Sequence, residues 1–546
     1  MLLSTMSATH RCLLVSEIFQ LIAEELYENG GLRTLTVLAR TCKVLHEAVL
    51  PVLWNSLESI VPLLRLFPPD TWSEIENPDG ETVLRITKPD ALEWTRFNHY
   101  APHVRKLIWK DRSDVSLLAL SALSVYRPLD KPLLPELRSL IWCEERAPYF
   151  AFVHLFLSPT IRELGLGTTD FEPDVIMALM ENAGRICTQI ELLTICTGRI
   201  SDSTPECTEA VGDAFARFIR ATPTLKAFNA EVYLPATCVE ALAALPRLEV
   251  LDLHMRPEDL EKVAASAACV SPKGYWFRTL ALLSLCVTRL DSSTKTFLEA
   301  IQSPALIELA ITTLRQPDAL TLRQQFEVLA HGPWRDNLMT LLLDFDQPFN
   351  ENAPPPSLDV GYALQPLYAL PVMDTLIIHG PTVFVDSSTL RSIANAWSKL
   401  EILSMLSWDV HPATERCLQL EDLVPLARKC PELNVLELHL NAEAVPDEAA
   451  MTRLLPEPSQ SPLRSLTVYD APITRPQRVA DFLERMFPEV HMIDYRGEAA
   501  FPDGARERFE MGWREVQRLL HSKFAARSPG LPACRCVGLG VSGEAA

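Results

Sequence analysis

The chain of 546 residues contains the stretch Leu433-Asn434-Val435-Leu436-Glu437-Leu438, with apolar residues at its first, fourth and sixth positions. Thirteen further stretches keep this pattern, and they begin at Val104, Leu137, Ile161, Ile190, Leu225, Leu248, Leu280, Leu306, Leu338, Met373, Leu400, Leu463 and Val490. Positions four and six lie two residues apart, so their side chains point to one face of a short strand. The fourteen stretches start about 30 residues apart on average, a period typical of repeat architectures. We therefore expect one short strand in each repeat.

The segments between these stretches have the spacing of amphipathic helices. Three of them show the pattern clearly, with one face made of Val211, Phe215, Phe218 and Ile219, of Leu420, Leu423, Leu426 and Ala427, or of Val479, Phe482, Leu483 and Met486. One strand and one helix cannot bury their apolar faces alone, whereas stacked neighbours can. The pattern therefore predicts a solenoid. The alternative is a set of independent α/β units whose strands merely look alike.

This array resembles the leucine-rich repeat family, although its period is longer than the usual 20–29 residues. The family places Asn or Cys eight residues after the first Leu, and only the repeat from Leu433 to Asn441 does so cleanly. The resemblance implies an α/β fold in which an irregular leucine-rich-repeat solenoid has its parallel sheet on the concave side and its helices outside.

The N-terminal segment has a different pattern, that of three short amphipathic helices. Ile18, Ile22 and Leu26 recur every four residues, with Ser16 as an N-cap, and Asn29-Gly30-Gly31 ends this first helix. The second helix carries Leu35, Leu38, Ala39 and Cys42, and the third carries Leu45, Ala48, Val49 and Val52 and ends near Leu53-Trp54. About 45 residues give a marginal core, so we expect apolar residues that need covering.

This segment resembles an F-box. The matching residues are Leu14-Val15-Ser16-Glu17-Ile18, Ile22 to Leu26, Leu38 to Cys42-Lys43, and Leu53-Trp54. Val15 stands where the family has proline, and the loop from Tyr27 to Arg33 is several residues long. Residues 57–66, 93–101 and 104–107 are similar to a group of fungal F-box proteins. An F-box followed by leucine-rich repeats is more specific than either part alone.

The resemblance implies a substrate-recognition subunit of an SCF-type cullin–RING ubiquitin ligase. In that family the F-box docks on a Skp-type adaptor, which joins it to the cullin scaffold, the repeats hold a protein client, and partner subunits transfer ubiquitin. The predicted adaptor-binding residues are Leu14, Ile18, Ile22, Leu26, Leu35, Leu38, Cys42, Leu45, Leu53 and Trp54. Two alternatives stay open: the helices only cap the solenoid, or the chain is an interaction scaffold outside any ligase.

Strand alternation also predicts a client surface. If Leu436 and Leu438 point inward, Glu437 and His439 point to the concave face. By this rule the client-binding residues are Asp252, His254, Asp344, His379, Glu437, His439, Tyr469 and Arg496, whereas earlier repeats expose Ile108, Ile141, Cys143, Thr194 and Cys196. Acidic and histidine side chains favour a polar or basic client segment. The alternative for each residue is a solvated sheet face.

Composition and motifs exclude several functions. Hydrophobic residues make up 48% and charged residues 22%, which is ordinary for a folded protein. The formal charge of −20 opposes nucleic-acid binding. The sequence contains no GxSxG, Walker-type or HExxH motif. We therefore expect no catalytic residues, no cofactor and no metal site. A deep concave pocket with strongly shifted titrating groups would revive an enzymatic interpretation.

Other segments bear on location and on the C-terminal region. The 13 cysteines are scattered without a CxxC pair, and neither a signal peptide nor an apolar run of eighteen residues occurs. We expect a cytoplasmic or nuclear protein that contacts no membrane. Residues 505–526 predict a capping helix with Phe509, Trp513, Val516 and Leu520 on one face. The predicted division is F-box 10–56, connecting segment 57–100, solenoid 101–500, capping helix 501–527 and disordered tail 528–546.

Overall fold

The computed structural model describes residues 16–76, 80–110, 114–128, 131–168, 173–196, 209–269, 276–346, 358–407, 417–468, 471–495 and 505–527. The chain forms two compact units, residues 1–285 with 300–303 (unit 1) and residues 286–299 with 304–546 (unit 2). Among the described residues, no helix combines the length and apolar character needed to span a membrane. The predicted tail, 528–546, lies outside the described residues.

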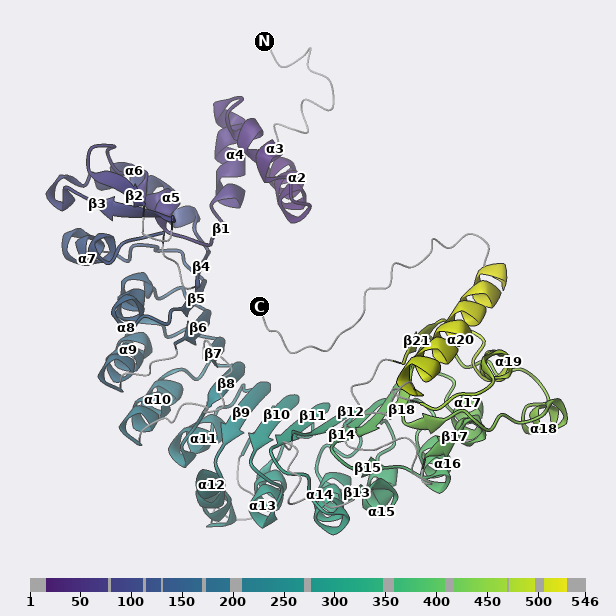
Figure 1. Cartoon of the computed structure of the whole chain (residues 1–546). Helices are drawn as coiled ribbons and strands as arrows, with labels where there is room; N and C mark the ends of the chain where they lie inside the picture. Colours follow the sequence, from purple (N-terminus) through teal and green to yellow (C-terminus); the bar gives the residue numbers. More distant parts are fainter. Residues whose placement is uncertain are drawn as a thin grey trace. The chain divides into compact units, whose positions relative to one another are not determined.

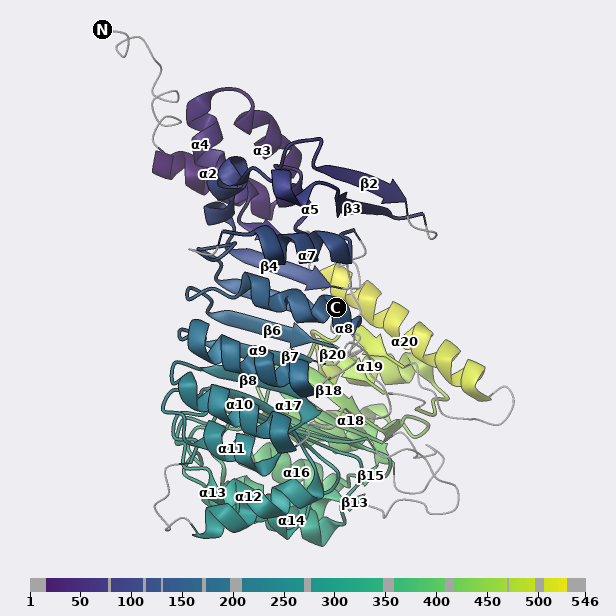
Figure 2. The ribbon, with the colours of Figure 1, turned by 90° about the vertical axis from the view of Figure 1, so that its left-hand side faces the viewer.

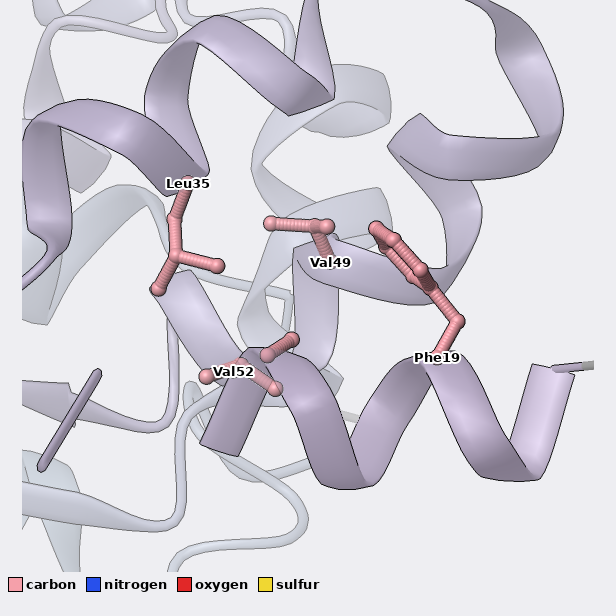
Figure 3. Packing of buried hydrophobic residues seen from close by; sticks show 5 residues of the cluster. Phe19, Leu35, Val49 and Val52 are labelled. Carbon is pink, nitrogen blue, oxygen red and sulfur yellow. The ribbon is translucent and has the colours of Figure 1, made fainter. Parts of the chain in front are cut away.

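Unit 1 begins with the three predicted helices, α2 (Ser16–Glu28), α3 (Leu32–Ala39) and α4 (Lys43–Leu53). Their core contains Phe19, Ala23, Leu35, Val49 and Val52, which converge from all three helices (Figure 3). Gly30 has a φ of 75° and ends α2, as predicted. The N–H groups of Gly31 and Gly30 donate to the carbonyls of Leu26 and Tyr27, which is the Schellman arrangement. A side chain at Gly31 would meet the carbonyl oxygen of Leu26 at 2.6 Å, so this turn requires glycine.

The next residues join these helices directly to the main sheet. Strand β1 (Ser56–Leu57) follows α4 after two residues and pairs in parallel with β4 (Lys106–Lys110). The carbonyl of Asn55 accepts hydrogen bonds from the N–H groups of both Arg105 and Lys106. Between β1 and β4 lie α5 (Val61–Leu64), the antiparallel pair β2 (Trp72–Glu76) and β3 (Thr82–Ile86), η1 (Pro89–Ala91), α6 (Trp94–Tyr100) and η2 (Ala101–His103).

The remaining strands of unit 1 extend this parallel sheet in sequence order. They are β5 (Ser139–Cys143), β6 (Glu163–Gly167), β7 (Leu192–Cys196), β8 (Ala227–Tyr233), β9 (Val250–Met255) and β10 (Leu282–Val287), whose last two residues are counted in unit 2. The intervening helical segments are α7 (Leu117–Tyr126), α8 (Ala147–Phe150), η3 (Ala151–Phe156), α9 (Pro173–Ile186), α10 (Glu209–Ala221), α11 (Ala236–Ala243) and α12 (Pro257–Cys269). They lie on one side of the strands (Figure 1), and β4 and β6 run in the same direction (Figure 2). We call the other side the open face.

Unit 2 repeats the arrangement. Its main strands are β11 (Glu308–Thr313), β12 (Thr340–Phe345), β14 (Thr375–Gly380), β16 (Ile402–Ser407), β18 (Val435–Leu438), β20 (Ser465–Thr467) and β21 (Met492–Asp494). Its helices are α13 (Ser292–Ala300), α14 (Ala319–His331), α15 (Val360–Leu364), η4 (Gln365–Ala369), α16 (Ser387–Ala396), η5 (Leu420–Leu423), α17 (Val424–Lys429), α18 (Glu448–Leu454), α19 (Pro476–Met486) and α20 (Ala505–Arg527). Two short parallel pairs, β13 (Leu358–Asp359) with β15 (Val383–Phe384) and β17 (Leu418–Gln419) with β19 (Leu440–Asn441), complete it.

Register explains the core of these repeats. Leu309, Leu341, Leu376, Leu403 and Leu436 occupy paired positions on successive strands of unit 2, and all are fully buried. Every one of the fourteen predicted stretches contains a strand of the main sheet. The predicted fold class, an α/β leucine-rich-repeat-like solenoid, is confirmed. The predicted C-terminal helix also forms: Trp513, Val516 and Leu520 of α20 are buried, and Trp513 Nε1 donates to the Ala471 carbonyl at 2.8 Å.

Candidate functional site

Exposed apolar side chains on the N-terminal helices form the first candidate site. We call Ile18, Leu21, Ile22, Leu32, Val37 and Val44 the helical apolar set. Leu21 is 66% exposed and Val37 is 63% exposed, although each lies on a helix whose other residues fill the internal core. Single exposed apolar residues are ordinary on a protein surface, whereas several on one small helical unit are typical of an interaction site.

The structure separates the ten predicted adaptor-binding residues into groups. Ile18, Ile22 and Cys42 are exposed, whereas Leu26, Leu38, Leu45 and Leu53 are half-buried against the helical core. Trp54 is half-buried and its ring lies 4.8 Å from that of Tyr100 in α6. Leu35 is fully buried, so it belongs to the internal core instead of a docking surface. Leu14 lies outside the described residues.

Sequence reasoning missed four members of the helical apolar set, which are Leu21, Leu32, Val37 and Val44. The F-box motif predicts adaptor contacts at other positions of these three helices. Helical periodicity could have found them: the buried residues Phe19 and Ala23 mark the inner face of α2, and Leu21 lies two residues from both, on the outside.

A row of polar side chains on the open face of unit 2 forms the second candidate site. We call Asp344, His379, Ser404, Glu437 and Thr467, from β12, β14, β16, β18 and β20, the polar stripe. Asp344 pairs in register with His379, and Glu437 pairs with both Ser404 and Thr467. Strand alternation places these side chains opposite the buried leucines, as the sequence predicted for Asp344, His379 and Glu437.

Hydrogen bonds join four members of the polar stripe. The Ser404 hydroxyl donates to Glu437 Oε2 at 2.5 Å, and the Thr467 hydroxyl donates to Glu437 Oε1 at 3.2 Å. His379 Nε2 lies 2.7 Å from Ser404 Oγ. Because the Ser404 proton is directed at Glu437, the nitrogen of His379 must donate, which defines its tautomer. Ser404 is fully buried and serves as a bridge between the two side chains.

The protein surroundings shift the pKa values of two members of the polar stripe, His379 and Asp344. Burial lowers the pKa of His379, although the carboxylates of Glu437 and Asp344 oppose this effect. Desolvation raises the pKa of Asp344, with Asp346 adding to the rise and His379 opposing it. Asp344 and Glu437 are the two acidic residues of the stripe, so its composition complements a basic segment.

The other predicted client residues have separate surroundings. His439 Nε2 accepts a hydrogen bond of 2.8 Å from the N–H of Ser407, which ties this side chain to the neighbouring repeat. Asp252 and His254 are half-buried on β9 of unit 1. Burial lowers the pKa of His254, and Asp252 and Glu231 oppose the shift. Tyr469 and Arg496 lie outside the described residues.

Comparisons with known proteins assign no family. No family model matches the chain, and no curated protein matches it. Among solved structures the chain is similar to TLR13 in complex with ssRNA13, at 13% identity and a TM-score of 0.37, over 73% of this chain and 55% of that chain. It is also similar to the yeast Rad7 and Elc1 complex, at 15% identity and a TM-score of 0.32, over 73% and 93% of the two chains. The chain thus spans about half the length of the TLR13 chain, and TM-scores this low carry no inference about function.

Proposed function

We propose that the chain is a non-catalytic substrate-recognition subunit of an SCF-type ubiquitin ligase. In this proposal α2, α3 and α4 dock on a Skp-type adaptor, which joins the chain to a cullin scaffold. The open face of the repeats holds a protein client, and partner subunits transfer ubiquitin. The observation that carries the proposal is the helical apolar set: a unit with the F-box sequence pattern leaves six large apolar side chains exposed.

Simple energetics support docking at these helices. Fully burying one Leu, Ile or Val side chain contributes about 1.5–3 kcal/mol. Association costs about 4–15 kcal/mol in lost translational and rotational freedom. The six side chains are 40–66% exposed, so burying the part that remains exposed contributes roughly 5–9 kcal/mol in total, which offsets an association cost in the lower half of that range.

Replacing a member of the helical apolar set with aspartate tests the docking. We expect Ile18→Asp and Val37→Asp each to weaken binding of a purified Skp-type adaptor about 10- to 100-fold, because a charge replaces a side chain that the complex buries. The measurement is isothermal titration calorimetry with the full chain. Thr188→Asp is the matched control, because it adds the same charge at an exposed position of unit 1 outside α2, α3 and α4. Circular dichroism checks that the helices remain folded.

Adaptor binding that is equal in the wild type and both variants would show that the helices do not dock through this face. Failure of the wild-type chain to bind any Skp-type adaptor would favour the second function considered from the sequence, an interaction scaffold outside a ligase.

The polar stripe gives the client half of the proposal a separate test. Proteins that accumulate when the chain is deleted are the candidate clients. Asp344→Asn combined with Glu437→Gln is expected to weaken binding of such a client at least tenfold in a purified assay and to leave adaptor binding unchanged. Asp336→Asn combined with Glu432→Gln removes the same charge from exposed positions of unit 2 and serves as the control. Equal client binding by both double variants would place the client elsewhere.

A further inference from the structure

A short antiparallel pair in unit 1 has one edge that no strand covers. Strand β2 pairs with β3 along its whole length. On the other side of β3, the N–H of Leu84 donates to the Asp114 carbonyl at 2.8 Å, and the Leu84 carbonyl accepts from the N–H of Ser116 at 2.9 Å. Strand β3 therefore lies between β2 and the start of α7 (Figure 2). Among the described residues, no other strand pairs with β2, so its second edge is open.

The hydrogen bonds of Leu84 define which backbone groups of β2 face the open edge. Leu84 lies opposite Glu74 in the register. Because both backbone groups of Leu84 point away from β2, this pair is a non-hydrogen-bonded one, and the N–H and C=O of Glu74 point away from β3. Alternation gives the backbone groups of Trp72 and Glu76 the same direction. No backbone hydrogen bond reaches these groups in the part of the chain that the structure describes. The edge is thus a row of unpaired donors and acceptors, which is a template for another strand.

The side chains of β2 indicate which kind of strand fits this edge. Glu74 and Glu76 are exposed and point to one face of the pair, whereas Ile75 is 44% exposed on the opposite face. Glu74 forms an ion pair with Arg65 at 2.6 Å, and Glu76 forms none within the described residues. Opposite charges on directly paired residues of adjacent strands are favourable. The edge therefore favours a strand with basic residues opposite the two glutamates.

A second copy of this chain does not fit the same edge. Two β2 strands paired in antiparallel fashion around Glu74 would place the two Glu74 side chains directly opposite each other. Like charges in that arrangement are destabilising. The formal charge of −20 adds to the repulsion between two copies. The charge of the edge therefore indicates a different partner, one with basic side chains.

We propose that the open edge of β2 binds an extended protein segment in which Lys or Arg alternates with apolar residues, by adding it to the pair as a third strand. Backbone hydrogen bonds to Trp72, Glu74 and Glu76 supply affinity, and the alternate side chains supply specificity. The basic side chains lie opposite the glutamates, and the apolar side chains lie on the face of Ile75. This site involves neither the helical apolar set nor the polar stripe, so it goes beyond the proposed function.

The first test is fluorescence anisotropy with the full chain and a fluorescein-labelled peptide, Arg-Val-Arg-Val-Arg-Val. We expect this peptide to bind about tenfold more tightly than Glu-Val-Glu-Val-Glu-Val, because only the basic side chains complement the glutamates. N-methylation of its arginine residues should weaken binding about tenfold, because it removes the N–H groups that face β2 and keeps the charge. Equal affinity for the methylated and unmethylated peptides would overturn the proposal, since it would show charge attraction without strand addition.

Two variants of one residue separate the backbone from the side chain. Glu74→Ala and Glu74→Pro both lose the carboxylate and the pair with Arg65, but only proline lacks the N–H at the open edge. Proline is tolerated at a strand edge whose N–H faces solvent, and circular dichroism checks the fold. We expect Glu74→Pro to bind the arginine peptide about tenfold more weakly than Glu74→Ala. Equal binding by the two variants would contradict strand addition at this edge.

The charge of the edge and the location of the site have their own controls. Glu76→Gln should lower the affinity for the arginine peptide about two- to fivefold, because one opposite-charge pair is lost. The double variant Asp344→Asn with Glu437→Gln should bind the peptide as the wild type does, because the polar stripe is a separate acidic site. A loss of binding in the double variant with none in Glu76→Gln would place the peptide on the polar stripe and overturn the proposal.

Discussion

Glu144→Ala is expected to lower the free energy of unfolding by about 1–3 kcal/mol, the usual cost of leaving a buried hydrogen-bond donor without its acceptor. Glu144 is 1% exposed. Its carboxylate accepts hydrogen bonds from Trp109 Nε1 at 3.0 Å and from Arg146 Nε at 2.7 Å. The alanine variant leaves the buried indole N–H of Trp109 without its acceptor, in a core where the Trp109 and Trp142 rings stack at 4.5 Å. Urea denaturation followed by tryptophan fluorescence measures the change.

Two controls make the effect of Glu144 interpretable. Glu136 pairs with Arg105 at 2.5 Å, but both side chains are more than one third exposed, so Glu136→Ala should cost less than about 1 kcal/mol. Glu144→Gln keeps an acceptor oxygen for the indole and should cost less than Glu144→Ala. Equal losses in Glu144→Ala and Glu136→Ala would mean that the buried carboxylate adds no more stability than a surface pair.

The second large effect is a loss of stability in acid that depends on His439. Burial lowers the pKa of His439 to about 4. The unfolded chain takes up a proton near pH 6.5 and the folded chain only near pH 4, so protons favour the unfolded state between these values. The contribution of His439 to the free energy of unfolding should therefore be fully present above pH 6.5. It should fall by about 3 kcal/mol as the pH drops through 4.

The measurement compares wild type and His439→Gln by urea denaturation at pH 7, 5.5 and 4. Glutamine keeps an oxygen that can accept from the Ser407 N–H, and it does not titrate. The wild type should lose about 3 kcal/mol more than the variant across this range. His331→Gln, at an exposed position of α14, should follow the wild type. Parallel curves for wild type and His439→Gln would contradict the assignment.

Strand alternation made the repeats predictable from the sequence. Each strand is short and its inward residues are large and apolar, so patterns such as Leu251 with Leu253 or Leu436 with Leu438 locate the strand and its buried face. The N-terminal helices were predictable for a similar reason, because Asn29-Gly30-Gly31 supplies the residues that a Schellman ending requires. The short strand pairs β13–β15 and β17–β19 could not be predicted from the sequence, because a strand of two residues has no periodic pattern.

The candidate sites were less predictable than the fold. Alternation placed Asp344, His379 and Glu437 on one face, but the link between His379 and Glu437 is Ser404, a small residue with no motif around it. Cys143, Gly167 and Cys196 come from three different repeats, and only the register of β5, β6 and β7 brings them together. Leu35 is an error of the opposite kind. The F-box motif predicted that it contacts an adaptor, but its side chain is buried in the core of the helices.

The junction at Asn55 has a mechanical consequence. A flexible tether lets a captured molecule diffuse through a volume set by tether length, and its local concentration falls as the tether grows. Here two residues separate α4 from β1, and the Asn55 carbonyl is held by two backbone N–H groups of the next strand. A partner bound to α2, α3 and α4 is therefore held close to a fixed position relative to the first repeat. The hydrogen-bonded backbone at Asn55 sets the distance between that partner and the repeat, and diffusion on a tether does not.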